Sequence, residues 1–226
     1  MSHSFRFPLV VLTLAAMLQS SHAQVAASAT VQFVSFPPVA DPKPIELLLG
    51  EGKTLVIEIP SDLPSDPYQV PRGASWTVGK SGPEKDGKPQ FNVFGTAPTL
   101  ASSHQLILLF RKGPSDADGF KVIPLDFKSQ FGDRMLLFFN LAREEFAAEV
   151  GGVKFSVKPG AQRIISPKAD KGGNLCHADL YYRKEETWKP FFSANWPLYD
   201  TTRGLFFIYA DPASSRLTLH AVDVSL

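Results

Sequence analysis

The chain contains very little cysteine, since Cys176 is the only one in 226 residues. A single thiol cannot form an internal disulfide, so the stability of the fold must come from a hydrophobic core. Long apolar runs are also missing. The longest extends from Phe7 to about Leu18, which is well short of the roughly 20 residues that a membrane-spanning helix requires. We therefore expect neither a disulfide framework nor a transmembrane segment.

The N-terminal segment has the pattern of a secretory signal peptide. Arg6 precedes the apolar run, and the polar stretch Ser21-His22-Ala23 carries small residues at the two positions that determine cleavage. We expect residues 1–23 to be removed and the protein to be exported, to the periplasm or to the extracellular space. Because Cys176 lies far from the cleavage point, the sequence excludes lipidation of the mature N-terminus.

The mature chain also lacks an excess of charge of either sign. The whole sequence has 23 Lys and Arg residues against 22 Asp and Glu residues, and Arg6 is the only charged residue in the signal. Removing the signal therefore leaves a formally neutral protein. A neutral chain lacks the basic field that attracts phosphate backbones, so we expect no nucleic-acid partner.

Short apolar runs separated by turn residues predict an all-β fold. Val31–Phe36, Leu106–Phe110, Met135–Leu141 and Leu205–Ala210 are examples, and sequences such as Asp118-Gly119 and Gly151-Gly152 lie between runs of this kind. The segment 141–149 has a helix-like composition, but it is short and leads directly into Gly151-Gly152. We therefore expect strands here and throughout the chain.

Two parts of the sequence resemble each other. Residues 98–110 align without a gap on residues 197–209, at a constant offset of 99. Phe120–Asp126 then matches Leu217–Asp223, and Val31–Phe36 matches Leu136–Leu141. The pattern predicts two tandem immunoglobulin-like β-sandwich units, at residues 27–128 and 132–226, that are related by internal duplication and joined by the polar segment 128–133.

Three of the predicted strands are apolar at every position: Leu106–Phe110, Leu136–Phe139 and Leu205–Tyr209. A strand with one face in water alternates apolar and polar side chains. Both faces of these strands are therefore expected to be covered. The cover is either the packing of the two units on each other or a second protein chain, and the sequence leaves both alternatives open.

No motif in the sequence specifies a chemistry. His177 follows Cys176 directly, but copper and zinc sites need further ligands at spacings that are missing here. A Gly-x-Ser-x-Gly nucleophile motif is also missing. We expect no catalytic residue, no metal site and no cofactor. Cys176 is predicted to be a small buried hydrophobe, and Ser115–Gly119 is predicted to be a hairpin turn and not a calcium loop.

The segment from Tyr181 to Trp196 is rich in aromatic residues and is the best candidate for ligand binding. Rings on a β-sandwich can stack on the apolar faces of sugars, so Tyr182, Trp188 and Trp196 are candidate ligand-binding residues. The alternative is that these rings fill the core or form cross-strand pairs. Aromatic residues at strand spacing more often pack in this second way, and Tyr182 and Trp188 are the rings expected to be exposed if any of them is.

Several turn sequences in the second half resemble those of a protein group. At Phe138–Leu141, Val150–Gly160 and Ser193–Pro197 the chain is similar to uncharacterised exported bacterial β-sandwich proteins with a "strand, Asn-Leu, small-residue turn, Lys-Pro-Gly" pattern. The resemblance covers mainly residues 120–226. It implies a bacterial origin and a β-sandwich fold, and it brings no catalytic residues.

These observations favour a non-catalytic cell-envelope or secreted protein that acts through contacts with a protein partner or through self-association. A first alternative is a carbohydrate-binding module that stacks a glycan on at least two exposed, coplanar rings of the aromatic segment. A second alternative is a small exported hydrolase. It requires His177 or His220 to meet an acidic residue and a serine or cysteine nucleophile in a concave pocket.

Overall fold

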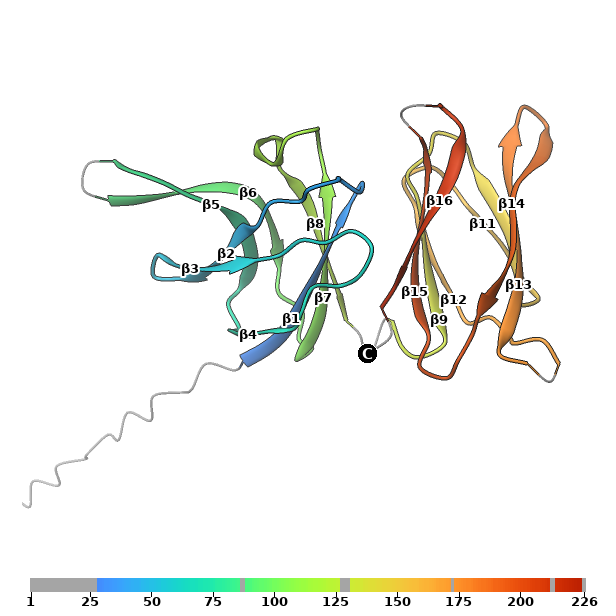
Figure 1. Cartoon of the computed structure of the whole chain (residues 1–226), viewed down its shortest axis with the longest axis horizontal. Helices are drawn as coiled ribbons and strands as arrows, with labels where there is room; N and C mark the ends of the chain where they lie inside the picture. Colours follow the sequence, from blue (N-terminus) through green and yellow to red (C-terminus); the bar gives the residue numbers. More distant parts are fainter. Residues whose placement is uncertain (1–27, 86–87, 127–130, 172, 212–213, 225–226) are drawn as a thin grey trace, which may run out of the picture.

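The computed structural model describes residues 28–85, 88–126, 131–171, 173–211 and 214–224, so the predicted signal peptide lies outside the described residues. The described part is almost entirely β (Figure 1). The first half contains β1 (Ser28–Phe36), β2 (Ile45–Gly50), β3 (Lys53–Ile57), β4 (Tyr68–Pro71), β5 (Ser75–Lys85), β6 (Lys88–Pro98), β7 (His104–Arg111), the 3₁₀ turn η1 (Asp116–Asp118) and β8 (Phe120–Asp126). The second half contains β9 (Met135–Asn140), β10 (Phe146–Val150), β11 (Val153–Val157), β12 (Gln162–Ile165), β13 (Leu175–Lys184), β14 (Thr187–Pro197), β15 (Arg203–Ala210) and β16 (Leu217–Asp223).

Each half forms a sandwich of two four-stranded sheets. In the first unit the outer sheet has the order β3-β2-β5-β6, and the inner sheet, which faces the other unit, has the order β4-β1-β7-β8. The second unit repeats this arrangement, with the inner sheet β12-β9-β15-β16 and the outer sheet β11-β10-β13-β14. The prediction of an all-β fold built from two β-sandwich units is confirmed. The residue boundaries predicted for the units stay predictions.

The repeat extends to the register of the strands. In the first unit Phe33 of β1 lies opposite Ile107 of the parallel strand β7, and in the second unit Phe138 of β9 lies opposite Phe206 of β15. These four positions are the ones that the sequence alignment makes equivalent. The pairs of β7 with β8 and of β15 with β16 agree with the alignment in the same way. Topology and register therefore both repeat.

The immunoglobulin-like part of the prediction is not confirmed. In an immunoglobulin sandwich the second and third strands belong to opposite sheets. Here β2 and β3 form a hairpin within one sheet, as β10 and β11 do in the second unit. The apolar pattern predicts strands and cores, but it does not determine in which order strands join a sheet.

The two inner sheets pack against each other and create a third, central core between the units (Figure 1). Leu137 and Phe139 of β9 point into this central core, whereas Leu136 and Phe138 point into the core of the second unit. In β7 and β15, likewise, alternate side chains point into the central core and into the core of the strand's own unit. Their uninterrupted apolar sequences thus result from packing of the two units on each other, the first of the two expected covers.

Aromatic rings dominate the central core. Phe36 of the first unit stacks on Phe207 of the second, with ring centroids 4.6 Å apart, and Phe110 packs edge-on against Phe139 at 5.4 Å. Phe131 lies in the connection that was predicted to be polar, and its side chain is completely buried in this core. His220 adds a directional contact, because its Nε2 lies 3.0 Å from the carbonyl oxygen of Ser61 in the first unit.

We expect residues 24–226 to form a monomer in solution. The strands that the sequence marked as candidates for covering by a second chain are already buried within one chain. Light scattering coupled to size-exclusion chromatography measures the mass directly. A stable dimer would contradict this expectation and would place an additional interface on the outer sheets or on the edge strands.

Smaller features also follow the sequence closely. No helix forms at 141–149, where a loop leads into β10. Ser115 caps the turn η1, and its side chain accepts a hydrogen bond from the backbone N–H of Ala117. Cys176 is fully buried, as predicted, and burial raises the pKa of its thiol. Within the described residues, no helix is long and apolar enough to span a membrane.

Candidate functional site

The three aromatic candidates lie in three separate depressions of the second unit. Tyr182 lines the end cavity, which is enclosed by the β9–β10 loop, the β13–β14 hairpin and the β15–β16 turn. Trp188 lines the outer-face depression on the outer sheet, and Trp196 lines the side pocket near the loop between β14 and β15. The structure does not bring the three rings together on one platform.

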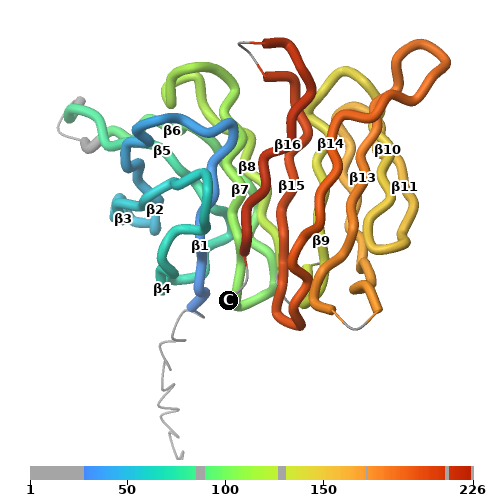
Figure 2. The backbone as a smooth tube through the Cα atoms, turned by 45° about the vertical axis from the view of Figure 1, so that its right-hand side comes forward, coloured from blue at the N-terminus to red at the C-terminus, as the bar shows by residue number. Residues whose placement is uncertain are grey.

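The register of the β13–β14 hairpin explains why Tyr182 and Trp188 are separated. Tyr182 pairs with Phe146, whose side chain is in the core, so it faces inward. Tyr181 pairs with Ala147 and faces outward. Trp188 pairs with Arg183, two positions after Tyr181, and therefore shares the outward face. Figure 2 shows this hairpin extending beyond the neighbouring strands β10 and β11.

Trp196 is half-buried and packs within the second unit. Its indole stacks on Phe206, with ring centroids 4.4 Å apart, and Phe206 stacks in turn on Phe138 at 4.7 Å. Trp188 is the most open of the three candidates, with 44% of its surface exposed. Of the three, Trp188 is the ring most accessible to a ligand, whereas the Trp196 ring mainly packs against Phe206.

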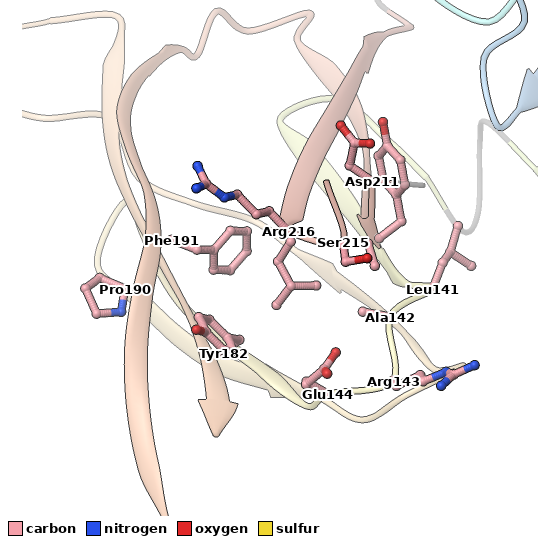
Figure 3. A pocket seen from close by; sticks show the side chains of 13 residues that line it. Leu141, Ala142, Arg143, Glu144, Tyr182, Pro190, Phe191, Asp211, Ser215 and Arg216 are labelled. Atoms are coloured by element: carbon pink, nitrogen blue, oxygen red, sulfur yellow. The ribbon is translucent and has the colours of Figure 1, made fainter. Parts of the chain in front are cut away.

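The end cavity has a volume of about 880 Å³. Figure 3 shows the ring of Phe191 and the side chain of Arg216 pointing into it from opposite sides, with Glu144 and Tyr182 below. Tyr182 and Phe191 meet edge to face at 6.2 Å. The complete lining is Leu141, Ala142, Arg143, Glu144, Tyr182, Pro190, Phe191, Tyr209, Ala210, Asp211, Ser215, Arg216 and Leu217.

Charges of both signs surround this cavity. Arg143 and Arg216 carry positive charges, and Glu144 and Asp211 carry negative ones. Burial, assisted by the nearby carboxylate of Asp211, raises the pKa of Tyr209, so its hydroxyl stays protonated at neutral pH. A ligand in the cavity would therefore meet hydrogen-bond donors, acceptors and aromatic surface together, with no net charge on the lining.

A buried asparagine holds the loop that forms the floor of the end cavity. The Asn140 side chain donates to the carbonyl oxygens of Glu144 and Val157, both at 2.8 Å, and its Oδ1 accepts from the backbone N–H of Ala142 at 3.0 Å. Leucine or valine at this position could not satisfy these groups. In the Asn-Leu pattern at the end of β9, the asparagine thus fixes the conformation of the loop that forms the cavity floor.

The other two walls are also braced. The backbone N–H of Arg183 donates to the carbonyl oxygen of Glu145 at 2.8 Å, which ties the hairpin to the floor loop. The carboxylate of Glu145 in turn accepts from the hydroxyl of Ser156. In the β15–β16 turn, the backbone N–H of Asp211 donates to the carbonyl oxygen of Arg216 at 2.9 Å, and Ser215 adopts a left-handed conformation with φ of 55°.

The first unit has a smaller counterpart of the end cavity. A depression of about 340 Å³ lies between its β1–β2 loop and the β7–β8 connection. Arg111 forms an ion pair with Asp116 there and lies over the ring of Phe120. None of the described residues of the β5–β6 hairpin is part of this lining, whereas β13 and β14 supply Tyr182, Pro190 and Phe191 to the end cavity. The enlargement is therefore specific to the second unit.

The outer-face depression is open and aromatic. Tyr181 and Trp188 flank Ala147, whose small side chain leaves room between them. Glu149 and Lys154 form an ion pair at 3.3 Å on the same lining. An exposed ring beside a pair of polar groups is an arrangement that can bind the apolar face and the hydroxyls of a sugar.

His177 lies on the same outer face but does not line any of the three depressions of the second unit described above. Its Nδ1 is 2.8 Å from Oδ1 of Asn195, and its Nε2 is 3.1 Å from a carboxylate oxygen of Asp179. The hydrogen bond to Asn195, followed by the charge of Asp179, raises the pKa of His177. Both partners favour the protonated ring.

We expect a nuclear magnetic resonance titration to place the pKa of His177 above the usual value of 6.5 for histidine. Because the folded-state pKa is raised, the stability contributed by His177 is fully present below its unfolded pKa and is lost as the pH rises through the folded pKa. The Asp179→Asn variant should move the pKa downward. An unchanged titration in that variant would show that Asp179 does not interact with the ring.

The arrangement expected for a hydrolase is not assembled around either histidine. His177 meets the acid Asp179 and the amide of Asn195, and His220 meets the Ser61 carbonyl and, at 3.7 Å, Asp62. No serine hydroxyl or thiol partner is found for these two rings in the described part of the chain. Likewise, within the described ranges, no three His, Cys, Asp or Glu side chains are close enough to hold a metal ion.

Sequence reasoning missed most of the end cavity. Glu144 lies far from Arg216 and Leu217 in the chain, and only the folded sandwich brings them together. Their individual sequence contexts carry no signal beyond ordinary turns and strands. Phe191 and Tyr181 lie within the aromatic segment, but their faces depend on a bulge in the β13–β14 pairing between Leu180 and Tyr181.

The chain matches no family model, and no curated protein resembles it in sequence.

Proposed function

We propose that this protein is a non-catalytic exported protein of the cell envelope or the extracellular space that binds a polypeptide partner in the end cavity of its second unit. The two units, which we take to be products of an internal duplication, then have different roles. The first unit and the central core hold the second unit in place. The second unit presents the binding site.

The enlarged end cavity is the observation that supports this proposal. It is concave, it lies at one end of a rigid sandwich, and its three walls are fixed by Asn140, by Glu145 and by the β15–β16 turn. Binding sites are preferentially concave, with aromatic surface and a few polar groups that fix orientation. The smaller depression in the first unit lacks the aromatic wall.

The chemistry of the lining favours a polypeptide. Peptides offer amide donors and acceptors together with apolar side chains, and they need no net charge on the receptor. Arg216 and Glu144 can each pair with a side chain or a backbone group of the partner, and Phe191 and Tyr182 supply stacking surface. Aromatic and arginine residues are also the types that contribute most to protein interfaces.

A carbohydrate ligand is the second candidate, and it belongs to a different place. Trp188 is 44% exposed and lies with Tyr181 in the outer-face depression, next to the Glu149–Lys154 ion pair. Such a site would bind the flat face of a sugar chain that lies across the outer sheet. It uses neither Phe191 nor Arg216, so the two candidates can be tested separately.

The test compares two ligand libraries with two single-ring variants. A phage-displayed peptide library and a glycan array are each applied to residues 24–226 as wild type, as Phe191→Ala and as Trp188→Ala. The proposal predicts peptides that bind the wild type and Trp188→Ala equally and lose at least about tenfold in affinity, roughly 1.4 kcal/mol, with Phe191→Ala.

Each remaining outcome has a definite meaning. Glycans that bind the wild type and Phe191→Ala but not Trp188→Ala would support the second candidate in place of the first. Selected peptides that bind Phe191→Ala as well as the wild type would overturn the assignment of the end cavity. A library that yields no binding peptide would overturn the polypeptide proposal itself.

A further inference from the structure

A second feature separates the two units, at the position that Gln105 occupies in the first unit and Gly204 in the second. Gln105 of β7 lies opposite Asp126 of β8 and Val31 of β1. Gly204 of β15 lies opposite Asp223 of β16 and Leu136 of β9. Both residues therefore have the same place in the inner sheet, and both face the core of their own unit.

In the first unit the Gln105 side chain occupies this place and is fully bonded. Its Oε1 accepts from the indole N–H of Trp76 at 2.8 Å and from the backbone N–H of Leu100 at 3.3 Å. Its Nε2 donates to the carbonyl oxygens of Leu100 and Ser102, at 3.1 Å and 2.8 Å. A carboxamide thus joins the tryptophan to the β6–β7 loop.

In the second unit the ring of Phe206 lies against Gly204, 2.7 Å from the position that a Cβ on this glycine would take, and the side pocket lies beside these two residues. The side pocket has a volume of about 290 Å³. It is lined by Gly204, by Leu136 and Asp223, which lie opposite Gly204 on the two neighbouring strands, and by Trp196 and Phe206. At roughly 30 Å³ for each water molecule, this is room for about ten waters or a ring with one substituent. The remaining lining residues are Pro197, Tyr199, Thr201, Thr202, Arg203, Ala221 and Val222.

The two units carry a tryptophan on different strands of the equivalent hairpin, β5 in the first unit and β14 in the second. In the first unit Trp76 of β5 pairs with Ala97 of β6, and in the second unit Cys176 of β13 pairs with Trp196 of β14. Each pair combines one large and one small side chain, so the cores stay filled. The exchange leaves an indole beside each of the two equivalent positions, beside Gln105 in one unit and beside Gly204 in the other.

The loop beside the side pocket keeps its shape without a glutamine. The backbone N–H of Tyr199, equivalent to that of Leu100, donates to the hydroxyl of Thr202 at 2.8 Å. The backbone N–H of Thr202 donates back to the carbonyl oxygen of Tyr199 at 3.0 Å. Because the loop is bonded internally, the second unit does not need a side chain at Gly204 for its stability.

We propose that the side pocket is a binding site for a small ring compound that carries one carboxamide or similar hydrogen-bonding group. The aromatic pair Trp196 and Phe206 would contact the ring. The polar group of the compound would donate to backbone carbonyl oxygens of the 199–202 loop, as Nε2 of Gln105 does to the corresponding loop of the first unit. This site is separate from the end cavity and does not depend on the polypeptide proposal.

Benzamide is the probe that matches this chemistry, and acetamide is the control that has the amide but no ring. The protein has three tryptophans, so a proton–nitrogen spectrum reports Trp196 directly, with the indoles of Trp76 and Trp188 as internal controls. We expect benzamide to cause a saturable shift of the Trp196 indole signal alone, and acetamide to cause none.

Two variants test the location. Gly204→Gln places the side chain of the first unit in the pocket; its Cβ would lie 2.7 Å from the ring of Phe206, so that ring must shift. Thr201→Phe places a large side chain in the pocket from an exposed loop position. This second variant still tests the location of the site if Gly204→Gln does not fold. Each folded variant should weaken benzamide binding at least tenfold. An absent or unsaturable Trp196 shift in the wild type, or unchanged affinity in the folded variants, would overturn the proposal.

Discussion

Replacing Phe207 with alanine is expected to lower the free energy of unfolding by about 3–5 kcal/mol, the range for a large aromatic ring removed from a packed core. Phe207 is 1% exposed and lies at the centre of the central core. Its ring contacts Phe36 and Phe110 from the first unit and Phe139 from the second. The substitution therefore opens a cavity in the contact between the units.

Denaturant unfolding of residues 24–226, followed by tryptophan fluorescence, measures this loss. Val56→Ala is the matched control, because Val56 is 63% exposed on the outer sheet of the first unit and should change stability by less than about 0.5 kcal/mol. A loss of less than about 1 kcal/mol for Phe207→Ala would mean that the two inner sheets do not pack as tightly as the ring contacts indicate.

Replacing Gln105 with leucine is expected to destabilise the protein by about 3 kcal/mol or more, because several buried polar groups lose their partner at once at about 1–3 kcal/mol each. Gln105 is 1% exposed, and the indole N–H of Trp76 depends on its Oε1. The backbone N–H of Leu100 loses its acceptor as well. In the second unit the corresponding N–H, that of Tyr199, donates to the Thr202 hydroxyl and does not depend on a side chain at position 204.

A double-mutant cycle separates the hydrogen bond from the packing. Trp76→Phe removes the indole N–H, so the double variant Trp76→Phe, Gln105→Leu no longer buries an unpaired donor at this place. Its loss of stability should be smaller than the sum of the two single losses by about 0.5–3 kcal/mol. Additive losses would show that Trp76 and Gln105 do not interact energetically, and would weaken the comparison between the two units.

Much of the fold was predictable because its main signals are local in sequence. The apolar runs and the turn residues between them are properties of neighbouring positions, and the strands formed where these patterns predicted them. The repeat was also visible, since an ungapped offset aligns Gln105 with Gly204 and the register of the sheets agrees with it. Strand order was not predictable in this way, because many orders bury the same alternating faces.

The candidate sites were less predictable, and particular residues show why. Trp196 belongs to an aromatic segment for which the sequence offered both ligand binding and core packing, and its ring stacks on Phe206 in the core. Tyr182 and Trp188 are close in sequence but face opposite sides of one hairpin. Gly204 attracts no attention in the sequence. It becomes a candidate site residue only through the comparison with Gln105 and through the side pocket that it lines.

The sequence by itself determined that this protein is built from strands, that its two halves correspond, and that three strands are covered on both faces, because apolar periodicity reflects burial directly. Only the tertiary structure decided what covers them. Phe207 meets Phe36 across the unit boundary, and the end cavity forms where Arg216, Phe191 and Glu144 converge from different strands and loops. Contacts between distant segments depend on the path of the whole chain, and no local pattern records that path.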